Sequence, residues 1–246
     1  IIVSHLHFDH MLDLLPLSYA LYIKGKSVPL YFPFETKNML IGTYRANNIM
    51  KFLESFIMFD SKGSIQVGPF KVTFLPVKHR IATVGVRVET EDGALAYSGD
   101  SAYCENLIKL ARDADIFLSE ATYLEKDKHR TEEGHMAAKE AALIAKEANV
   151  KKLLLTHIWF EYDKVDSLKE AKRVFKKVEI AQEIGRREGL LPEDGRIITS
   201  LVNVINFKEL SKKVRKIQNV KVKQFLEKYV LKYVKKTQKG GKILIS

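Results

Sequence analysis

The chain has 246 residues, 46% of them hydrophobic and 10% aromatic, which is enough for one sizeable folded core and argues against disorder. No uninterrupted apolar run reaches the roughly 18 residues of a membrane-spanning helix, so we expect no membrane contact. The single cysteine, Cys104, excludes an internal disulfide framework and favours a reducing, cytoplasmic location.

The formal net charge of +11 is concentrated at one end of the chain. Residues 207–246 hold thirteen Lys and Arg against two Glu, a net of 13 − 2 = +11, which leaves residues 1–206 balanced at 28 against 28. The charge is therefore no evidence that residues 1–206 bind nucleic acid.

Apolar spacing and turn residues predict the elements in chain order. The first part contains a strand end at 1–4, a helix at 11–23, a strand at 28–32, mostly helix over 36–57, two strands within 64–76, and a hairpin of 84–89 with 94–98. Alternating helices and strands follow, at 104–112, 116–119, 136–148, 152–156, 167–175 and 178–181, with Ser167 and Glu170 as a capping box for the helix that begins there. This alternation predicts an α/β fold with helices layered on a sheet.

A dense group of metal ligands follows the first strand. The stretch Ser4-His5-Leu6-His7-Phe8-Asp9-His10 places four such side chains within six residues, which would arise by chance on the order of once in several thousand sequences. Imidazole and carboxylate suit zinc and similar divalent ions, and the lack of a cysteine cluster excludes a closed structural zinc site. The motif therefore predicts an open, catalytic metal site.

Three further ligands follow predicted strands. His79, Asp100 and His157 come after the strands that end near residues 77, 98 and 156. Strand ends meet at one edge of a sheet, where α/β folds place their sites, so we expect all three beside the His-rich stretch. Seven ligands are enough for two metal ions.

The order of these motifs resembles the metallo-β-lactamase superfamily. The resemblance rests on H-x-H-x-D-H, a later His, an Asp after Tyr97-Ser98-Gly99, and Leu155-Thr156-His157, and it covers about residues 1–183. It implies an αββα sandwich and two divalent ions, zinc or in some members manganese or iron. Carried over by motif, it assigns His5, His7 and His79 to the first ion, Asp9, His10 and His157 to the second, and Asp100 as the bridge.

Two other stretches resemble the ribonuclease Z and phosphodiesterase branch of that superfamily. They are Gly134-His135-Met136-Ala137-Ala138-Lys139-Glu140 and Ser119-Glu120-Ala121-Thr122. The resemblance implies that His135 contacts the scissile phosphate and that Glu120 orients it. We therefore expect Asp9, His135 and Glu120 to act in catalysis.

The expected activity is metal-dependent hydrolysis of a phosphodiester, such as RNA or a cyclic nucleotide. His79 and Asp100 are 21 positions apart, and a tight hairpin fills the interval, so the chain is similar to compact relatives without a tRNA-binding arm. Three alternatives stay open: tRNA 3′ processing by a ribonuclease Z-type endonuclease without the arm, a lactonase or thioesterase, and a nucleic-acid-binding protein with a vestigial site and a basic tail. The family's tendency to dimerise suggests a homodimer.

The expected organisation is a hydrolase domain over 1–183, a connecting segment over 184–206, and a basic helical extension over 207–246. Because members of the family normally start with several strands before the His-rich loop, we expect the domain to lack its first strands and to expose a sheet edge. Outside the motifs, His129 is expected to be solvated, Asp13 to lie on a solvated helix face, and Cys104 to pack. Trp159, Phe160 and Tyr162 either line the substrate pocket or cover the core.

Overall fold

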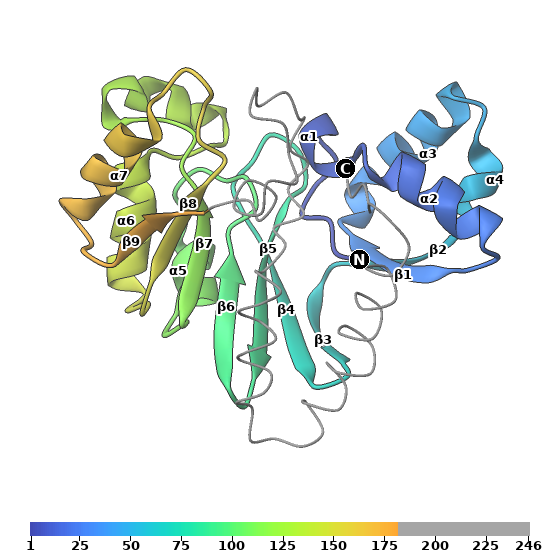
Figure 1. Cartoon of the computed structure of the whole chain (residues 1–246), viewed down its shortest axis with the longest axis horizontal. Helices are drawn as coiled ribbons and strands as arrows, with labels where there is room; N and C mark the ends of the chain where they lie inside the picture. Colours follow the sequence, from blue (N-terminus) through green and yellow to red (C-terminus); the bar gives the residue numbers. More distant parts are fainter. Residues whose placement is uncertain (182–246) are drawn as a thin grey trace, which may run out of the picture.

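The computed structural model describes residues 1–181 (Figure 1). The expected connecting segment and basic extension lie outside the described residues, and the division into three parts stays a prediction. Within residues 1–181, no helix is long and apolar enough to cross a membrane.

The described elements alternate as an α/β chain. In order they are α1 (Phe8–Met11), α2 (Leu14–Ile23), β1 (Val28–Phe32), η1 (Phe34–Thr36), α3 (Lys37–Ala46), α4 (Met50–Leu53), β2 (Phe56–Asp60), β3 (Gly63–Val67), β4 (Phe70–Pro76), β5 (Val84–Thr90), β6 (Gly93–Tyr97), α5 (Glu105–Ala111), β7 (Ile116–Glu120), η2 (Glu125–Glu133), α6 (Ala138–Glu147), β8 (Leu153–Thr156), α7 (Lys164–Lys172) and β9 (Val178–Ile180).

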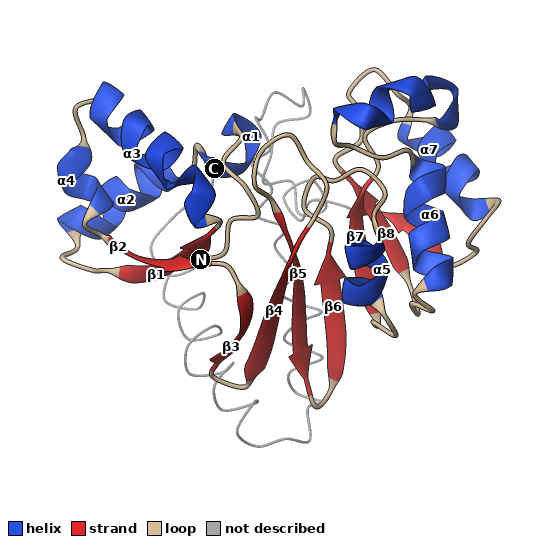
Figure 2. Ribbon diagram, turned by 180° about the vertical axis from the view of Figure 1, so that it is seen from behind, coloured by secondary structure: helices blue, strands red, loops and turns tan. Residues whose placement is uncertain are grey.

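Two sheets lie between two groups of helices. The strands β3 to β9 form one sheet in sequence order, antiparallel from β3 to β6 and parallel from β6 to β9. β1 and β2 form a small parallel sheet, to which the N-terminal segment is attached by a bridge between Ile2 and Tyr31. Helices α2 to α4 flank the small sheet, and α5 to α7 flank the other end of the large one (Figures 1 and 2). The predicted α/β class is confirmed, with helices outside both sheets.

Alanines let helix α6 approach the sheet closely. Ala138, Ala141, Ala142 and Ala145 are fully buried, because their spacing places them on one face of the helix. They belong to a core cluster that also contains the side chains of β7 and β8, including Phe117. This packing holds rigid the two strands whose ends carry site residues.

A second core supports the His-rich segment. Leu6, Met11 and Leu14 are buried in one cluster with residues of β1, α3 and β2. The hydroxyl of the buried Tyr44 donates a hydrogen bond of 2.9 Å to the backbone oxygen of Leu14. The start of α2 is thereby tied to α3, and the ligand-bearing segment before it cannot shift freely.

Several predicted boundaries were wrong. The stretch predicted as mostly helical over 36–57 is interrupted at Asn48, whose φ is 55°, resumes as the short α4, and ends with two residues that belong to β2. Strand β2 has buried or half-buried Phe56 and Met58 alternating with the exposed Ile57 and Phe59, which is a period of two. The strand expected at 1–4 is a single bridge.

Helix starts were also misplaced. The first helical turn begins at Phe8, so two of the predicted ligands lie on α1 and not in a loop. Ser167 does not cap a helix: it is buried inside α7, whose N-cap is Asp163, with the carboxylate accepting from the Val165 amide at 2.8 Å. The 3₁₀ segment η2 was not predicted.

A pair of glycine substitutions should change stability in opposite directions. Gly99 has φ +60°, and a Cβ there would lie 2.9 Å from the Val84 backbone oxygen, so Gly99→Ala should lower the free energy of unfolding by about 2 kcal/mol or more. Gly42 lies in α3 with nothing within 4 Å of a Cβ, so Gly42→Ala should raise it by about 0.5–1 kcal/mol. Urea unfolding of both variants measures the difference, and equal effects would contradict this account of Gly99.

Candidate metal centre

The structure brings all seven predicted ligands together. His5 and His7 follow the N-terminal segment, and Asp9 and His10 lie on α1. The others follow the ends of β4, β6 and β8, and are His79, Asp100 and His157. The ligand atoms fall into two groups, each with its atoms within 4.8 Å of one another, made of His5, His7 and His79, and of Asp9, His10, Asp100 and His157.

The first group consists of three ring nitrogens that face one another. His7 Nδ1 lies 3.1 Å from His5 Nε2 and 3.0 Å from His79 Nε2. Burial, reinforced by the charge of His10, lowers the pKa of His5 to about 2, and burial also lowers the pKa values of His7 and His79. Neutral imidazoles are the form that binds a metal, and donors on a tetrahedral zinc ion stand about 3.3 Å apart. The group therefore fits one divalent ion.

The second group is built around two carboxylates. Asp9 Oδ2 lies 3.2 Å from His157 Nε2 and 3.4 Å from His10 Nε2. Asp100 Oδ2 lies 3.3 Å from His10 Nε2, 3.4 Å from His157 Nε2 and 3.6 Å from His5 Nε2 of the first group. Asp100 is thus the side chain that both groups share, as a bridging ligand would be.

The two carboxylates of the second group favour positive charge beside them, as protons on the histidines or as a metal ion. Burial opposes the charged forms of His10 and His157, but the carboxylates of Asp100 and Asp9 raise both pKa values to about 9. The pKa values of the two carboxyl groups are lowered in turn: that of Asp9 by its histidine contacts, and that of Asp100 by the same histidines against its burial. Within the described residues, the buried His10 Nε2 and Asp100 Oδ1 have no hydrogen-bond partner. A second divalent ion here would satisfy these groups.

Backbone and hydroxyl groups orient the ligand rings. His79 Nδ1 donates to the Gly134 backbone oxygen at 2.6 Å, which leaves Nε2 facing the first group. Gly134 has φ +94°, and a Cβ there would lie 2.8 Å from His79 Nδ1. Only glycine therefore fits at the end of η2, against this histidine. His157 has a positive φ of 52°, which places strain at a predicted ligand.

Thr122 sets the proton position on His157. Its hydroxyl donates to Glu120 Oε2 at 2.7 Å and so must accept from His157 Nδ1, 2.8 Å away. With the proton on Nδ1, the Nε2 of the neutral ring is free to bind a metal.

Glu120 connects both groups to His135. It is almost fully buried, and its Oε1 accepts from the Ser101 amide at 2.6 Å and from His135 Nδ1 at 3.0 Å. Its Oε2 also accepts from the Met136 amide at 3.2 Å. The predicted contact between Glu120 and His135 is present, and the His135 ring stacks on His157 with centroids 5.5 Å apart.

Sequence reasoning missed four residues of the site: Ser101, Thr122, Gly134 and Ser4, whose hydroxyl lies 3.1 Å from His5 Nδ1. Thr122 and Gly134 belong to the same motifs as Glu120 and His135. The sequence does not indicate which histidine ring a threonine hydroxyl or a glycine will contact. His129 lies exposed on η2, away from the ligands, as expected. Asp13 is half-buried and not on a solvated face, and burial raises its pKa.

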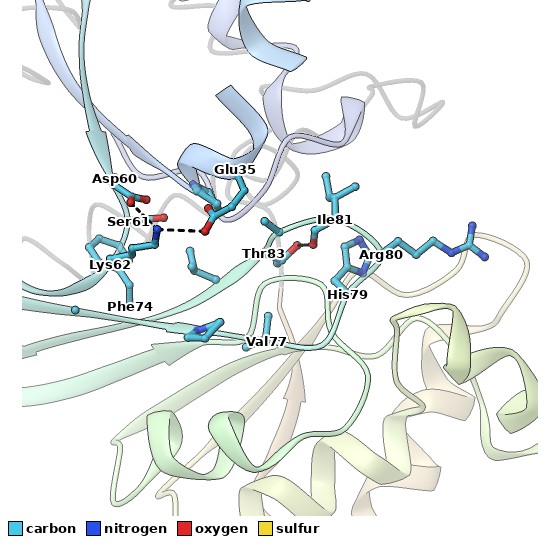
Figure 3. Close-up of a pocket in the computed structure, with 15 residues that line it drawn as sticks. Glu35, Asp60, Ser61, Lys62, Phe74, Val77, His79, Arg80, Ile81 and Thr83 are labelled. Atoms are coloured by element: carbon cyan, nitrogen blue, oxygen red, sulfur yellow. Dashed lines mark hydrogen bonds and ion pairs between the residues drawn. The ribbon is translucent and has the colours of Figure 1, made fainter. Parts of the chain in front are cut away.

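A groove of about 390 Å³ adjoins His79 (Figure 3). Its lining runs from Glu35 and Lys62 to the loop between β4 and β5. Lys62 is paired with Glu35 at 3.2 Å and Asp60 at 3.0 Å, so its charge is already neutralised. The groove thus offers space beside the candidate centre but no free cation at Lys62 for an anionic substrate.

Comparisons with known proteins agree with this geometry. Residues 1–158 match the model of the beta-lactamase superfamily domain. The chain is 32% identical over 183 residues to the probable metallo-hydrolase YhfI of Bacillus subtilis (strain 168), covering 71% of this chain and 72% of the relative. The crystal structure of YhfI matches with a TM-score of 0.62 over 74% of each chain. A protein named ribonuclease Z from Azobacteroides pseudotrichonymphae genomovar. CFP2 is 32% identical over 226 residues, covering 74% of this chain and 78% of that one.

Removing the Thr122 hydroxyl should weaken metal binding. In Thr122→Val, His157 Nδ1 and Glu120 Oε2 lose their shared partner, and we expect zinc affinity to fall about 10- to 100-fold. Thr122→Ser keeps the hydroxyl and should bind zinc like the wild type. Competition with a chromophoric chelator measures both affinities, and equal values for the two variants would refute the orienting role.

Proposed function

This chain belongs to the beta-lactamase superfamily, and on that premise we propose that it is a metal-dependent hydrolase that cleaves phosphodiester bonds with two divalent ions, zinc before manganese or iron. The observation that carries the proposal is the convergence of two ligand groups on Asp100 Oδ2, within 3.6 Å of His5, His10 and His157. His135 stands beside both groups.

The described residues suggest how two ions would be held. His5, His7 and His79 would bind the first, Asp9, His10 and His157 the second, and Asp100 both. Bound divalent ions lower the pKa of a water molecule and neutralise charge on substrate oxygens, which is the chemistry that phosphodiester hydrolysis needs. Asp9, with its side chain 52% exposed, is the ligand most open to the incoming substrate.

His135 supports a phosphodiester in particular. Burial disfavours its charged form, but Glu120 outweighs burial and raises the pKa of His135. Because Nδ1 is bonded to Glu120, Nε2 is left to donate a proton to a phosphate oxygen or to the leaving alkoxide. Glu120 would act as the positioning residue that keeps the ring in place.

The alternatives differ in what supports them. A relative named ribonuclease Z favours RNA as the substrate, but β5 and β6 are joined by a two-residue turn, so no tRNA-binding arm lies between them. A lactonase or thioesterase would use the same ligands without needing His135. A nucleic-acid-binding protein with an inactive site is disfavoured, because without catalysis nothing would maintain seven ligand side chains in contact.

We also retain a homodimer, a cyclic-nucleotide substrate and a cytoplasmic location as proposals.

Replacing the shared ligand should abolish hydrolysis. In Asp100→Ala both groups lose their common oxygen, so we expect turnover of bis-p-nitrophenyl phosphate to fall to background and about two bound metal equivalents to fall to one or none. Spectrophotometric turnover and elemental analysis of purified protein measure these changes. Asp92→Ala, in the exposed β5–β6 turn, removes a carboxylate without touching the site and should behave like wild type. Wild-type turnover by Asp100→Ala would contradict the two-metal proposal.

Removing His135 should slow the chemical step and spare the metals. We expect His135→Ala to lower kcat about 10²- to 10⁴-fold, the usual contribution of a positioned proton donor, with metal content unchanged. His129→Ala removes an exposed histidine from η2 and serves as the matched control. If both variants keep wild-type kcat, His135 has no part in the reaction.

A further inference from the structure

A row of aromatic rings leads outward from His135. The Tyr123 ring lies edge-on to His135, with centroids 6.1 Å apart. The Arg130 guanidinium lies 4.8 Å from the centre of the Tyr123 ring and 5.5 Å from that of Trp159. Trp159 in turn contacts Phe160, with centroids 5.0 Å apart. We call the rings of Tyr123, Trp159 and Phe160, together with the Arg130 guanidinium that contacts the first two, the aromatic row.

The row starts buried and ends in solvent. Tyr123 is 2% exposed, whereas the Phe160 ring at the far end is 81% exposed. The Trp159 amide donates to the backbone oxygen of Thr122 at 3.1 Å, which fixes the loop to the residue that orients His157. Phe160 thus stands three positions beyond a predicted metal ligand, on a loop anchored to the site. An aromatic ring left in water at such a place is a candidate contact for substrate.

The row also carries polar groups without partners. Arg130 forms no ion pair with any carboxylate whose side chain the structure describes, and its charge is held over two rings. Trp159 Nε1 is buried and has no hydrogen-bond partner within residues 1–181. The nearby Lys126 lies over Tyr162, whose hydroxyl donates to Asp127, so those groups are already engaged.

Flat rings and a guanidinium without an ion pair together suit one kind of ligand. A nucleobase offers a π-face for stacking and polar atoms on its edge, and it is joined to the phosphate that the metal groups would hold. An aliphatic acyl group offers no π-face to the rings or to the guanidinium. The 81% exposure of Phe160 argues against a core-covering role for that ring.

We propose that Trp159 and Phe160, with Arg130, form the subsite that stacks on the nucleobase of a nucleotide phosphodiester. This inference rests on the proposed function and deepens it by naming the substrate class. For Trp159 and Phe160 it favours contact with substrate over the core-covering role that the sequence left open. Phe160 is then a specificity-determining residue.

The test uses the only tryptophan of the chain as its reporter. Adenosine 5′-monophosphate and ribose 5-phosphate are titrated into the zinc-loaded full chain while the fluorescence of Trp159 is followed. Stacking predicts saturable quenching by the nucleotide and at least tenfold weaker apparent binding of the sugar phosphate. Equal responses to the two ligands, or no response to either, would overturn the proposal.

Variants of Phe160 locate the effect. Phe160→Ala should bind the nucleotide roughly 5- to 100-fold more weakly, the range found when one base-stacking side chain is removed, and Phe160→Tyr should retain binding. Tyr19→Ala removes a ring that is 50% exposed on α2 and should leave binding unchanged. Unaltered nucleotide affinity in Phe160→Ala would refute the role of Phe160.

The titration needs no turnover, so it separates this inference from the proposed function. Nucleotide binding that depends on Phe160, without hydrolysis of bis-p-nitrophenyl phosphate, would retain the subsite and reject the phosphodiesterase. Hydrolysis with a nucleotide response that ignores Phe160 would retain the phosphodiesterase and reject the subsite.

Discussion

One carboxylate oxygen holds the candidate centre together. Asp100 Oδ2 is buried within 3.6 Å of ring nitrogens from His5, His10 and His157, side chains that come from opposite ends of the described chain. A buried carboxylate is stabilised by positive charge beside it, and here that charge is either protons on the histidines or metal ions. The neutral histidines of the first group and the exposed Asp9 of the second group lie around this carboxylate.

A second buried carboxylate, Glu120, gives the site its rigidity. It accepts hydrogen bonds from the Ser101 amide, next to Asp100, and from Thr122, Met136 and His135. These contacts span β6, β7 and the start of α6, so the position of His135 depends on the packing of the large sheet. The same Thr122 hydroxyl orients His157, which couples the proton donor of the proposed reaction to the second metal group.

The fold supplies the edges at which these groups meet. Strand ends of β4, β6 and β8 place three ligands, and the small sheet with its own core places the other four. Beyond this centre, the aromatic row differs in character from the groove near His79, where the exposed Lys62 is paired with Glu35 and Asp60.

The sequence alone predicted the seven candidate ligands and the α/β order, because H-x-H-x-D-H is improbable by chance and strand ends share an edge, and the family resemblance supplied their division into two groups. Local signals failed where tertiary contacts decide: β2 follows an asparagine break within an apolar stretch, and Asp163 caps α7 in place of Ser167. The contact of Thr122 with His157 and the ring contacts that lead from His135 to Phe160 could be seen only in the tertiary structure. Most of these contacts join residues that are far apart in sequence. The sequence pattern around a hydroxyl or a ring does not indicate which residue it will contact.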